Sequence, residues 1–239
     1  VAGIVVAQGN NGSGVAGVNW DVKLMIVRVG SPESNAIASY SYPLEMRKQY
    51  NQSGGQKGAF VVATNASWGV DFGQPADAPL WCAMYDTLGT YGILSFGATI
   101  NGNVDVDQQG DLPTACPSDY LISVTNMNRN DTKETQAGYG ATTIDLGSFG
   151  AGTYTTAAGN SYGGFGGTSG ATPHVAGGAA LLYSAPCPNF ADVARNYPDS
   201  AALLVREWIL DGVDANSSLA NITVTGGRQN LFHCIRRYL

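Results

Sequence analysis

Short apolar runs alternate along the chain with longer segments that have helical character. Four runs of seven or eight residues have the length and composition of buried strands: Lys23–Val29, Ala59–Asn65, Tyr91–Ala98 and Tyr120–Asn126. Helices are predicted at Val1–Gln8, Pro79–Thr90 and Ala36–Tyr50, the last with an interruption or bend at Pro43. Strands that alternate with helices are typical of a parallel sheet, so the pattern predicts an α/β fold.

The last hundred residues follow a different pattern. From residue 137 to 167 the chain is rich in glycine, and short extended pieces are expected around Ile144 and Tyr154. Two helices are predicted to close the chain. The first, Ser169–Ser184, has small residues on nearly all sides, which suits a buried helix. The second lies between Pro198 and Gly212 and has one apolar stripe: Ala201, Leu204, Val205, Trp208 and Ile209. No internal repeat or linker interrupts the sequence, so we expect a single domain over residues 1–239.

Composition excludes two classes of partner. The chain has 239 residues, of which 44% are hydrophobic and 13% are charged. No apolar run approaches the roughly 18 residues that a membrane helix needs, so no membrane association is expected. The formal net charge is -6 and no basic run offsets it. This balance argues against a nucleic-acid partner.

Four cysteines indicate an oxidising compartment, and we expect a secreted, extracellular protein. No CxxC pair is present, so zinc binding and dithiol redox chemistry are disfavoured. Three pairings are open. We predict disulfides Cys82–Cys116 and Cys187–Cys234, because each pair brackets one compact stretch of chain. Four buried free thiols remain the alternative.

The segment Gly167–Gly177, GTSGATPHVAG, is the most informative part of the sequence. It delivers Ser169 to the first turn of the buried helix, where free backbone amides and the helix dipole favour a developing negative charge. A lone serine at this position would more simply be a helix cap. All eleven residues together, however, resemble the nucleophile motif of subtilisin-like serine peptidases and depart from it only at Gly170, where the family has Met. The resemblance implies a three-layer subtilisin-like fold and makes Ser169 the catalytic nucleophile.

Two further segments match the family in order. Asn65–Gly69 resembles the strand end that pairs with extended substrate, which implies substrate binding by Ser67, Trp68 and Gly69. A core aromatic is the alternative for Trp68.

Gly92–Asn101 resembles the strand that leads to the oxyanion-hole asparagine, which implies this role for Asn101. The residue before it is Ile100 instead of the usual Gly, so Asn103 is an alternative, as is a plain turn asparagine. Gly97, Ala98 and Thr99 are small enough to line an open apolar pocket. We therefore expect Ala98 and Thr99 to bind substrate, with some preference for large apolar side chains.

The resemblance implies a Ser–His–Asp mechanism, yet the chain has only two histidines. His174 lies about 140° round the helix from Ser169, at ~100° per residue, and matches a non-catalytic position of the motif. His233 matches no family position. Val1–Val18 resembles the helix and loop that follow the family's catalytic histidine. We therefore expect a serine endopeptidase whose catalytic Asp and His come from a segment absent from this chain, an N-terminally truncated form that is inactive alone.

A separate N-terminal chain or a second copy could complete such a fold, with a protein or peptide as substrate. A non-catalytic pseudo-peptidase that acts as a binding or scaffold domain is the alternative, and the departures at Gly170 and Ile100 favour it slightly. No cofactor is required by the chemistry. The loop Gly9–Gly14 resembles one that often binds calcium in the family, but a glycine turn without metal is the simpler interpretation.

Overall fold

A six-stranded sheet forms the centre of the protein. The computed structural model describes residues 1–30 and 33–238. The strand order is β1-β3-β5-β6-β10-β9, and every pair is parallel except the last. The strands are β1 Ala63–Ala66, β3 Leu94–Ala98, β5 Leu121–Met127, β6 Leu146–Phe149, β9 Asp214–Ala215 and β10 Gly227–Arg228. The predicted α/β fold with a mostly parallel sheet is confirmed.

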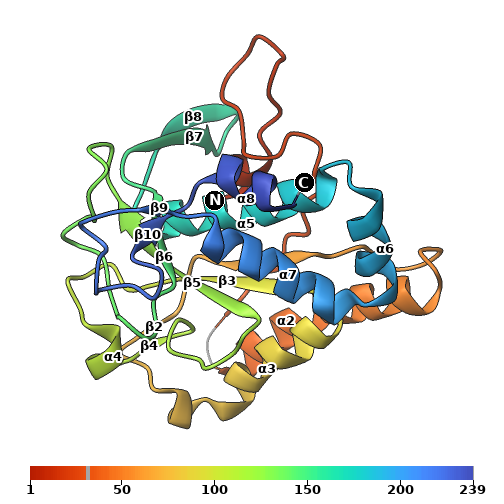
Figure 1. The fold of residues 1–239 in the computed structure, drawn as a ribbon, viewed down its shortest axis with the longest axis horizontal. Coiled ribbons are helices and arrows are strands. Elements are labelled where there is room, and N and C mark those ends of the chain that lie inside the picture. The colour runs from red at the N-terminus through yellow and green to blue at the C-terminus, as the bar shows by residue number, and fades with distance from the viewer. Residues whose placement is uncertain (31–32, 239) are drawn as a thin grey trace.

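Helices and two small ladders surround this sheet (Figure 1). The helices are α1 Ala2–Val6, α2 Glu33–Gln52, α3 Pro79–Thr90, α4 Val106–Gln109, α5 Thr168–Ser184, α6 Pro188–Asn196, α7 Pro198–Asp211 and α8 Leu231–Tyr238, with a 3₁₀ turn at Pro75–Asp77. The ladders pair β2 Val70–Asp71 with β4 Asp111–Leu112, and β7 Thr153–Ala157 with β8 Ser161–Phe165. No helix in the described residues has the length and hydropathy needed to cross a bilayer.

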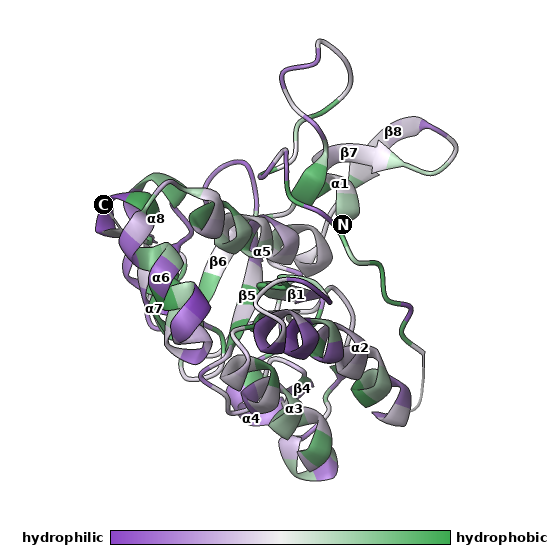
Figure 2. Ribbon diagram, turned by 90° about the vertical axis from the view of Figure 1, so that its right-hand side faces the viewer, coloured by the Kyte–Doolittle hydropathy of each residue, from purple (hydrophilic) through white to green (hydrophobic). Residues whose placement is uncertain are grey.

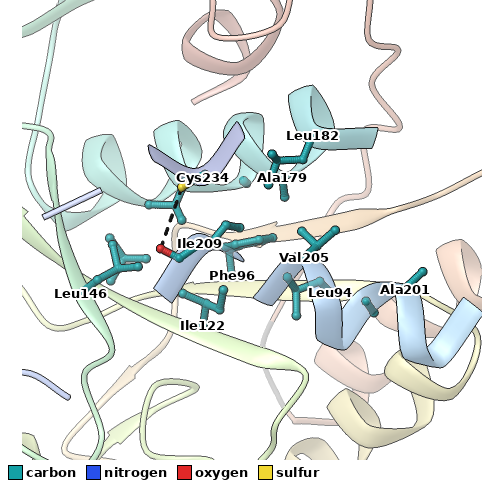
Figure 3. Packing of buried hydrophobic residues seen from close by; sticks show 14 of the residues in the cluster. Leu94, Phe96, Ile122, Leu146, Ala179, Leu182, Ala201, Val205, Ile209 and Cys234 are labelled. Carbon is teal, nitrogen blue, oxygen red and sulfur yellow. Dashed lines mark hydrogen bonds between the residues drawn. The ribbon is translucent and has the colours of Figure 1, made fainter. Parts of the chain in front are cut away.

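The strands lie between two layers of helices (Figure 2). Leu94, Phe96 and Ile122 belong to a cluster with α5 and α7, which Figure 3 shows from close by. Ile93 and Leu121 belong to a second cluster with α2 and α3. Because side chains alternate between the faces of a strand, each strand contributes to both layers. Full burial of one such leucine contributes about 1.5–3 kcal/mol, so these two clusters hold the sheet between its helices.

The predicted strand at Lys23–Val29 is wrong. This segment is extended but forms no helix or strand, and Ile26 is 78% exposed. Figure 2 shows it as a separate trace that leads into α2. Apolar residues form a strand only where a neighbouring strand accepts their hydrogen bonds, and no strand in residues 1–30 and 33–238 pairs with this segment.

The prediction of two closing helices is also wrong, because the described chain has four helices after residue 167. The last predicted helix is confirmed as α7, between Pro198 and Gly212. The two that the sequence analysis missed, α6 and α8, have nine and eight residues. Both helices are shorter than the window of roughly 11–18 residues over which a helical period can be recognised in a sequence.

One of the two predicted disulfides forms. Cys82 and Cys116 are joined and link α3 to the loop before β5, which confirms that pairing. The predicted pair Cys187–Cys234 is wrong, since both cysteines are free. Cys187 precedes α6 and is half-buried, whereas Cys234 is buried in α8 with its sulfur directed toward the carbonyl of Ile209 (Figure 3). The two residues bracket α6 and α7, but these helices do not bring them together.

Candidate active site

Three segments meet at one edge of the central sheet. The parallel neighbours β1 and β3 end at Ala66 and Ala98. The carboxyl ends of parallel strands point to the same edge, which is where α/β folds place their ligands. The residues that follow these strands, Ser67–Gly69 and Thr99–Asn101, both contact the start of α5, as the hydrogen bonds below show.

Ser169 and Ser67 hold each other through two hydrogen bonds. The hydroxyl of Ser67 donates to the carbonyl of Ser169 at 3.0 Å, and the hydroxyl of Ser169 donates to the carbonyl of Ser67 at 3.3 Å. The side-chain amide of Asn65 donates in turn to the Ser67 hydroxyl at 2.9 Å. The structure therefore brings together the nucleophile and the substrate-binding segment that the sequence singled out, with Ser169 partly accessible to solvent.

Asn101 is the asparagine that contacts the nucleophile segment. Its Oδ1 accepts from the backbone N–H of Thr168 at 3.0 Å and from the Thr168 hydroxyl at 3.2 Å. With Oδ1 held in this way, the Nδ2 donors are left on the other side of the amide. Asn103, the alternative, makes neither of these contacts. This geometry suits Asn101 as a donor to a charge that develops beside Ser169.

Two glycines make this close approach feasible. Gly167 has a φ of 71°, and a Cβ at that position would lie 2.5 Å from Oδ1 of Asn101. Gly170 replaces the methionine of the family, and a Cβ there would lie 2.9 Å from the carbonyl oxygen of Gly150. The small residue at 170 is thus explained by the backbone of the chain after β6, which passes directly against the helix start.

The first turn of α5 has a backbone N–H that is available to an anionic ligand. The N–H of Gly170 donates to the carbonyl of Gly167 at 2.9 Å. Within the described residues, the N–H of Ser169 has no acceptor. Together with the dipole of a 17-residue helix, this N–H is suited to stabilise a negative oxygen.

Neither histidine reaches Ser169. The Nδ1 of His174 lies 2.8 Å from the carbonyl of Gly170, one turn back on α5. Burial lowers the pKa of His174, which favours its neutral form. His233 lies on α8 and its Nδ1 is 3.1 Å from Asp214. As the sequence analysis expected, His174 has a structural contact, and the Ser169 hydroxyl donates to a carbonyl and not to a base.

A cleft of about 590 Å³ borders the site. One wall comes from the extended segment and the other from β1 and the residues that follow it: Val27, Val29, Gly30, Asn65, Ser67 and Trp68. Trp68 also stacks on Trp81, with ring centroids 5.2 Å apart and planes inclined by 17°. Trp68 is therefore both a partly buried core aromatic and a wall of the cleft. Ala98 and Thr99, expected to line an open pocket, are only 7% and 2% exposed.

One polar residue of this region, Asp111, was not predicted from the sequence. Its Oδ2 accepts from the Thr99 hydroxyl at 3.0 Å and from the N–H of Ile100 at 2.9 Å, directly before Asn101. Asp111 stands in a polar stretch that also contains Asp105 and Asp107, and it belongs to no motif, so only the fold reveals the contact.

The loop Gly9–Gly14 could offer calcium only neutral ligands, such as asparagine side chains and backbone carbonyls. It contains no carboxylate, and the Oδ1 of Asn11 already accepts from the N–H of Ser13 at 3.0 Å. Calcium prefers six to eight oxygen ligands, several of them charged. In the described part of the chain, no group of three or more His, Cys, Asp and Glu is arranged to hold a metal ion.

Comparisons with known proteins found relatives among bacterial proteases. Alkaline elastase YaB of Bacillus sp. (strain YaB) is 33% identical over 183 residues, which are 76% of this chain and 43% of that protein. Subtilisin BL of Lederbergia lenta is 29% identical over 183 residues, which are 76% of this chain and 61% of that protein. The chain thus spans about half the length of these relatives.

The fold has a counterpart among solved structures. A structure of proteases from Pseudoalteromonas arctica PAMC 21717 matches with a TM-score of 0.78 at 23% sequence identity, covering 100% of this chain and 69% of that chain. At that identity the match shows the fold alone, a subtilisin-like three-layer α/β arrangement. Residues 1–219 also match the model of the subtilase family. From the motif at Ser169, the convergence of three loops on it and this match, the chain belongs to the subtilase family.

Proposed function

We propose that this protein is a serine endopeptidase that cleaves peptide bonds through an acyl-enzyme on Ser169. The Oγ of Ser169 attacks the carbonyl carbon of the scissile bond, and its proton passes to a histidine base. Collapse of the tetrahedral intermediate breaks the C–N bond, and the base returns the proton to the leaving amine. Water then attacks the ester carbon with the same base and releases Ser169.

The developing oxyanion would accept from Nδ2 of Asn101 and from the N–H of Ser169. The observation that carries this proposal is the clamp on Asn101: its Oδ1 accepts twice from Thr168, the residue next to the nucleophile. Extended substrate would lie along Ser67–Gly69, with Trp68 beside a large apolar side chain.

The base and its orienting carboxylate would come from a segment outside these 239 residues. The three residues whose structure is not described are Ser31, Pro32 and Leu239, so none of them is a histidine. A second copy of the chain would bring only the same two histidines, so a segment of different sequence is favoured. The chain alone is then expected to be inactive.

Two features support a place for that segment. In the described residues β1 is the edge strand of the central sheet, with β3 as its only neighbour. The extended segment around Val27 and Val29 forms the opposite wall of the cleft beside it. A strand inserted between them would pair with β1 and give the exposed apolar residues of 23–29 a neighbour.

Hydrolysis of a chromogenic peptide tests the proposal. The enzyme is the completed protein, that is, the 239-residue chain together with the segment that supplies the histidine base and its carboxylate. We expect Ser169→Ala to abolish hydrolysis. It should also abolish the acyl-enzyme adduct that mass spectrometry would detect on Ser169. Asn101→Ala should lower kcat by about 10²–10³, the effect of removing one oxyanion donor. The matched controls Ser161→Ala and Asn103→Ala, both at exposed positions, should leave kcat unchanged. Equal losses for Asn101→Ala and Asn103→Ala would contradict the assignment.

The second candidate is a non-catalytic binding domain. It is favoured by one observation, the donation of the Ser169 hydroxyl to a carbonyl instead of a base. A completed protein that binds peptide equally well with and without Ser169→Ala, and hydrolyses it in neither form, would support this candidate.

We also propose that the protein works outside the cell. The Cys82–Cys116 disulfide supports an oxidising compartment, since reducing compartments disfavour such bonds.

A further inference from the structure

A buried carboxylate lies directly behind the proposed oxyanion donor. Asp111, in β4, is 2% exposed. Its Oδ2 accepts three hydrogen bonds, from the Thr99 hydroxyl at 3.0 Å, the Ile100 N–H at 2.9 Å and the Thr114 hydroxyl at 2.6 Å. Among the described residues no hydrogen bond reaches Oδ1.

This carboxylate is buried without a cation. No Lys, Arg or His of the described chain forms an ion pair with Asp111, and Asp71, its partner in the β2–β4 ladder, is a further negative group. Burial raises the pKa of Asp111 to about 6. Burying a charge costs free energy unless hydrogen bonds satisfy it. Three donors from two loops offset part of that cost and in return join those loops.

We propose that Asp111 is a positioning residue for the oxyanion hole. It fixes the backbone of Thr99 and Ile100 and so aims the Nδ2 of Asn101. This role rests on the proposed function, in which Asn101 donates to the oxyanion.

The contacts of Asn101 make it sensitive to this anchor. Its side chain is held at one end by Thr168. Its backbone continues from Ile100, whose N–H is held by Asp111 and whose side chain packs with Val106 and Ile144. Without the carboxylate, the Ile100 N–H and the Thr99 hydroxyl would lose their acceptor inside the protein, and the loop would move to find another.

Substitutions can separate the two roles of Asp111, as a hydrogen-bond acceptor and as a negative charge. Because all three donors reach Oδ2, Asp111→Asn can place its carbonyl oxygen there and keep every hydrogen bond. Asp111→Ala removes the acceptor. Asp107, in the nearby helix α4, provides a matched control: it accepts from Thr142 and Thr143 but does not contact Thr99 or Ile100.

The kinetic test uses the completed protein, with active sites counted by titration. We expect Asp111→Ala to lower kcat by about 10–10³, up to the loss of a whole oxyanion donor, with KM changed less than about threefold. Asp111→Asn should restore kcat to within about threefold of wild type, and Asp107→Asn should leave it unchanged. An equal kcat per active site in Asp111→Ala and wild type would overturn the proposal.

A second measurement uses the 239-residue chain and needs no activity. In ¹⁵N spectra, the side-chain amide of Asn101 should shift with pH through the pKa of Asp111, about 6. The shift should be absent in Asp111→Asn. A merely structural aspartate would move the Ile100 amide alone, and an Asn101 side chain that does not follow the titration would overturn the proposal.

The two failures are distinguishable. If Ser169→Ala keeps hydrolysing, the proposed function fails, and the Asn101 resonance still decides whether Asp111 aims that side chain. If Ser169→Ala is inactive and Asp111→Ala is as active as wild type, only the role of Asp111 fails.

Discussion

The two flanks of β1 differ in hydrogen bonding and in the burial of apolar side chains. On the β3 side, Ser67, Asn101 and Asp111 each accept or donate defined hydrogen bonds around the start of α5. On the other side, β1 has no neighbouring strand in the described residues, and the apolar segment opposite it leaves Ile26 78% exposed. The proposed nucleophile and oxyanion donor are therefore held by hydrogen bonds, while the flank from which we expect the base has no neighbouring strand in the described residues.

The largest expected difference between the two flanks is in how much a leucine on each contributes to the free energy of unfolding. Leu94 in β3 is fully buried in the core cluster, whereas Leu24 on the open flank is 41% exposed. We expect Leu94→Ala to lower the free energy of unfolding by about 2–5 kcal/mol, through lost burial and the cavity left behind. Leu24→Ala, the same change on the other flank, should cost less than about 0.5 kcal/mol. Urea unfolding of both variants makes the comparison, and a comparable loss for Leu24→Ala would mean that the flank is packed in solution.

The pH dependence of stability tests the β3 side of β1, where Asp111 is buried. Burial raises the pKa of Asp111 from its ordinary 3.8 to about 6. Between these values the folded chain keeps a proton that the unfolded chain releases, so this group's contribution to stability falls as pH rises through the window. The difference corresponds to ~3 kcal/mol.

Between about pH 4 and pH 7, the free energy of unfolding of the wild type should therefore fall by up to this amount relative to that of Asp111→Asn. Asp145, whose pKa burial also raises to about 6, is common to both proteins and cancels. Urea unfolding at a series of pH values measures the difference. A difference between the two proteins that is constant across this range would contradict the raised pKa of Asp111.

The sequence predicted elements wherever local pattern and neighbours agree. Pro79–Thr90 is reproduced to the residue as α3, and the proline and glycine around α7 mark its ends. Lys23–Val29 has the composition of a strand, but a strand also depends on a partner that composition does not supply. Likewise, the Cys187–Cys234 pair has a plausible spacing, yet the packing of α6 and α7 decides whether the sulfurs meet.

The site divides in the same way. The sequence could single out Ser169 and Asn101 as candidates because each lies in a contiguous segment that resembles the family, Gly167–Gly177 and Gly92–Asn101. Asp111 could not, since its three donors come from Thr99, Ile100 and Thr114 and converge only when β4 folds beside the end of β3. The explanation for Gly170 is equally non-local, because the atom that excludes a side chain there belongs to Gly150.

The central claim is that this chain holds a preorganised nucleophile without its base. The rate at which a fluorophosphonate labels Ser169 tests it directly, measured in the 239-residue chain alone and in the same chain completed by the proposed segment. We expect completion to raise the labelling rate by about 10²–10⁴, the usual contribution of a general base. Rapid labelling of Ser169 in the chain alone, at the rate of the completed protein, would contradict the account.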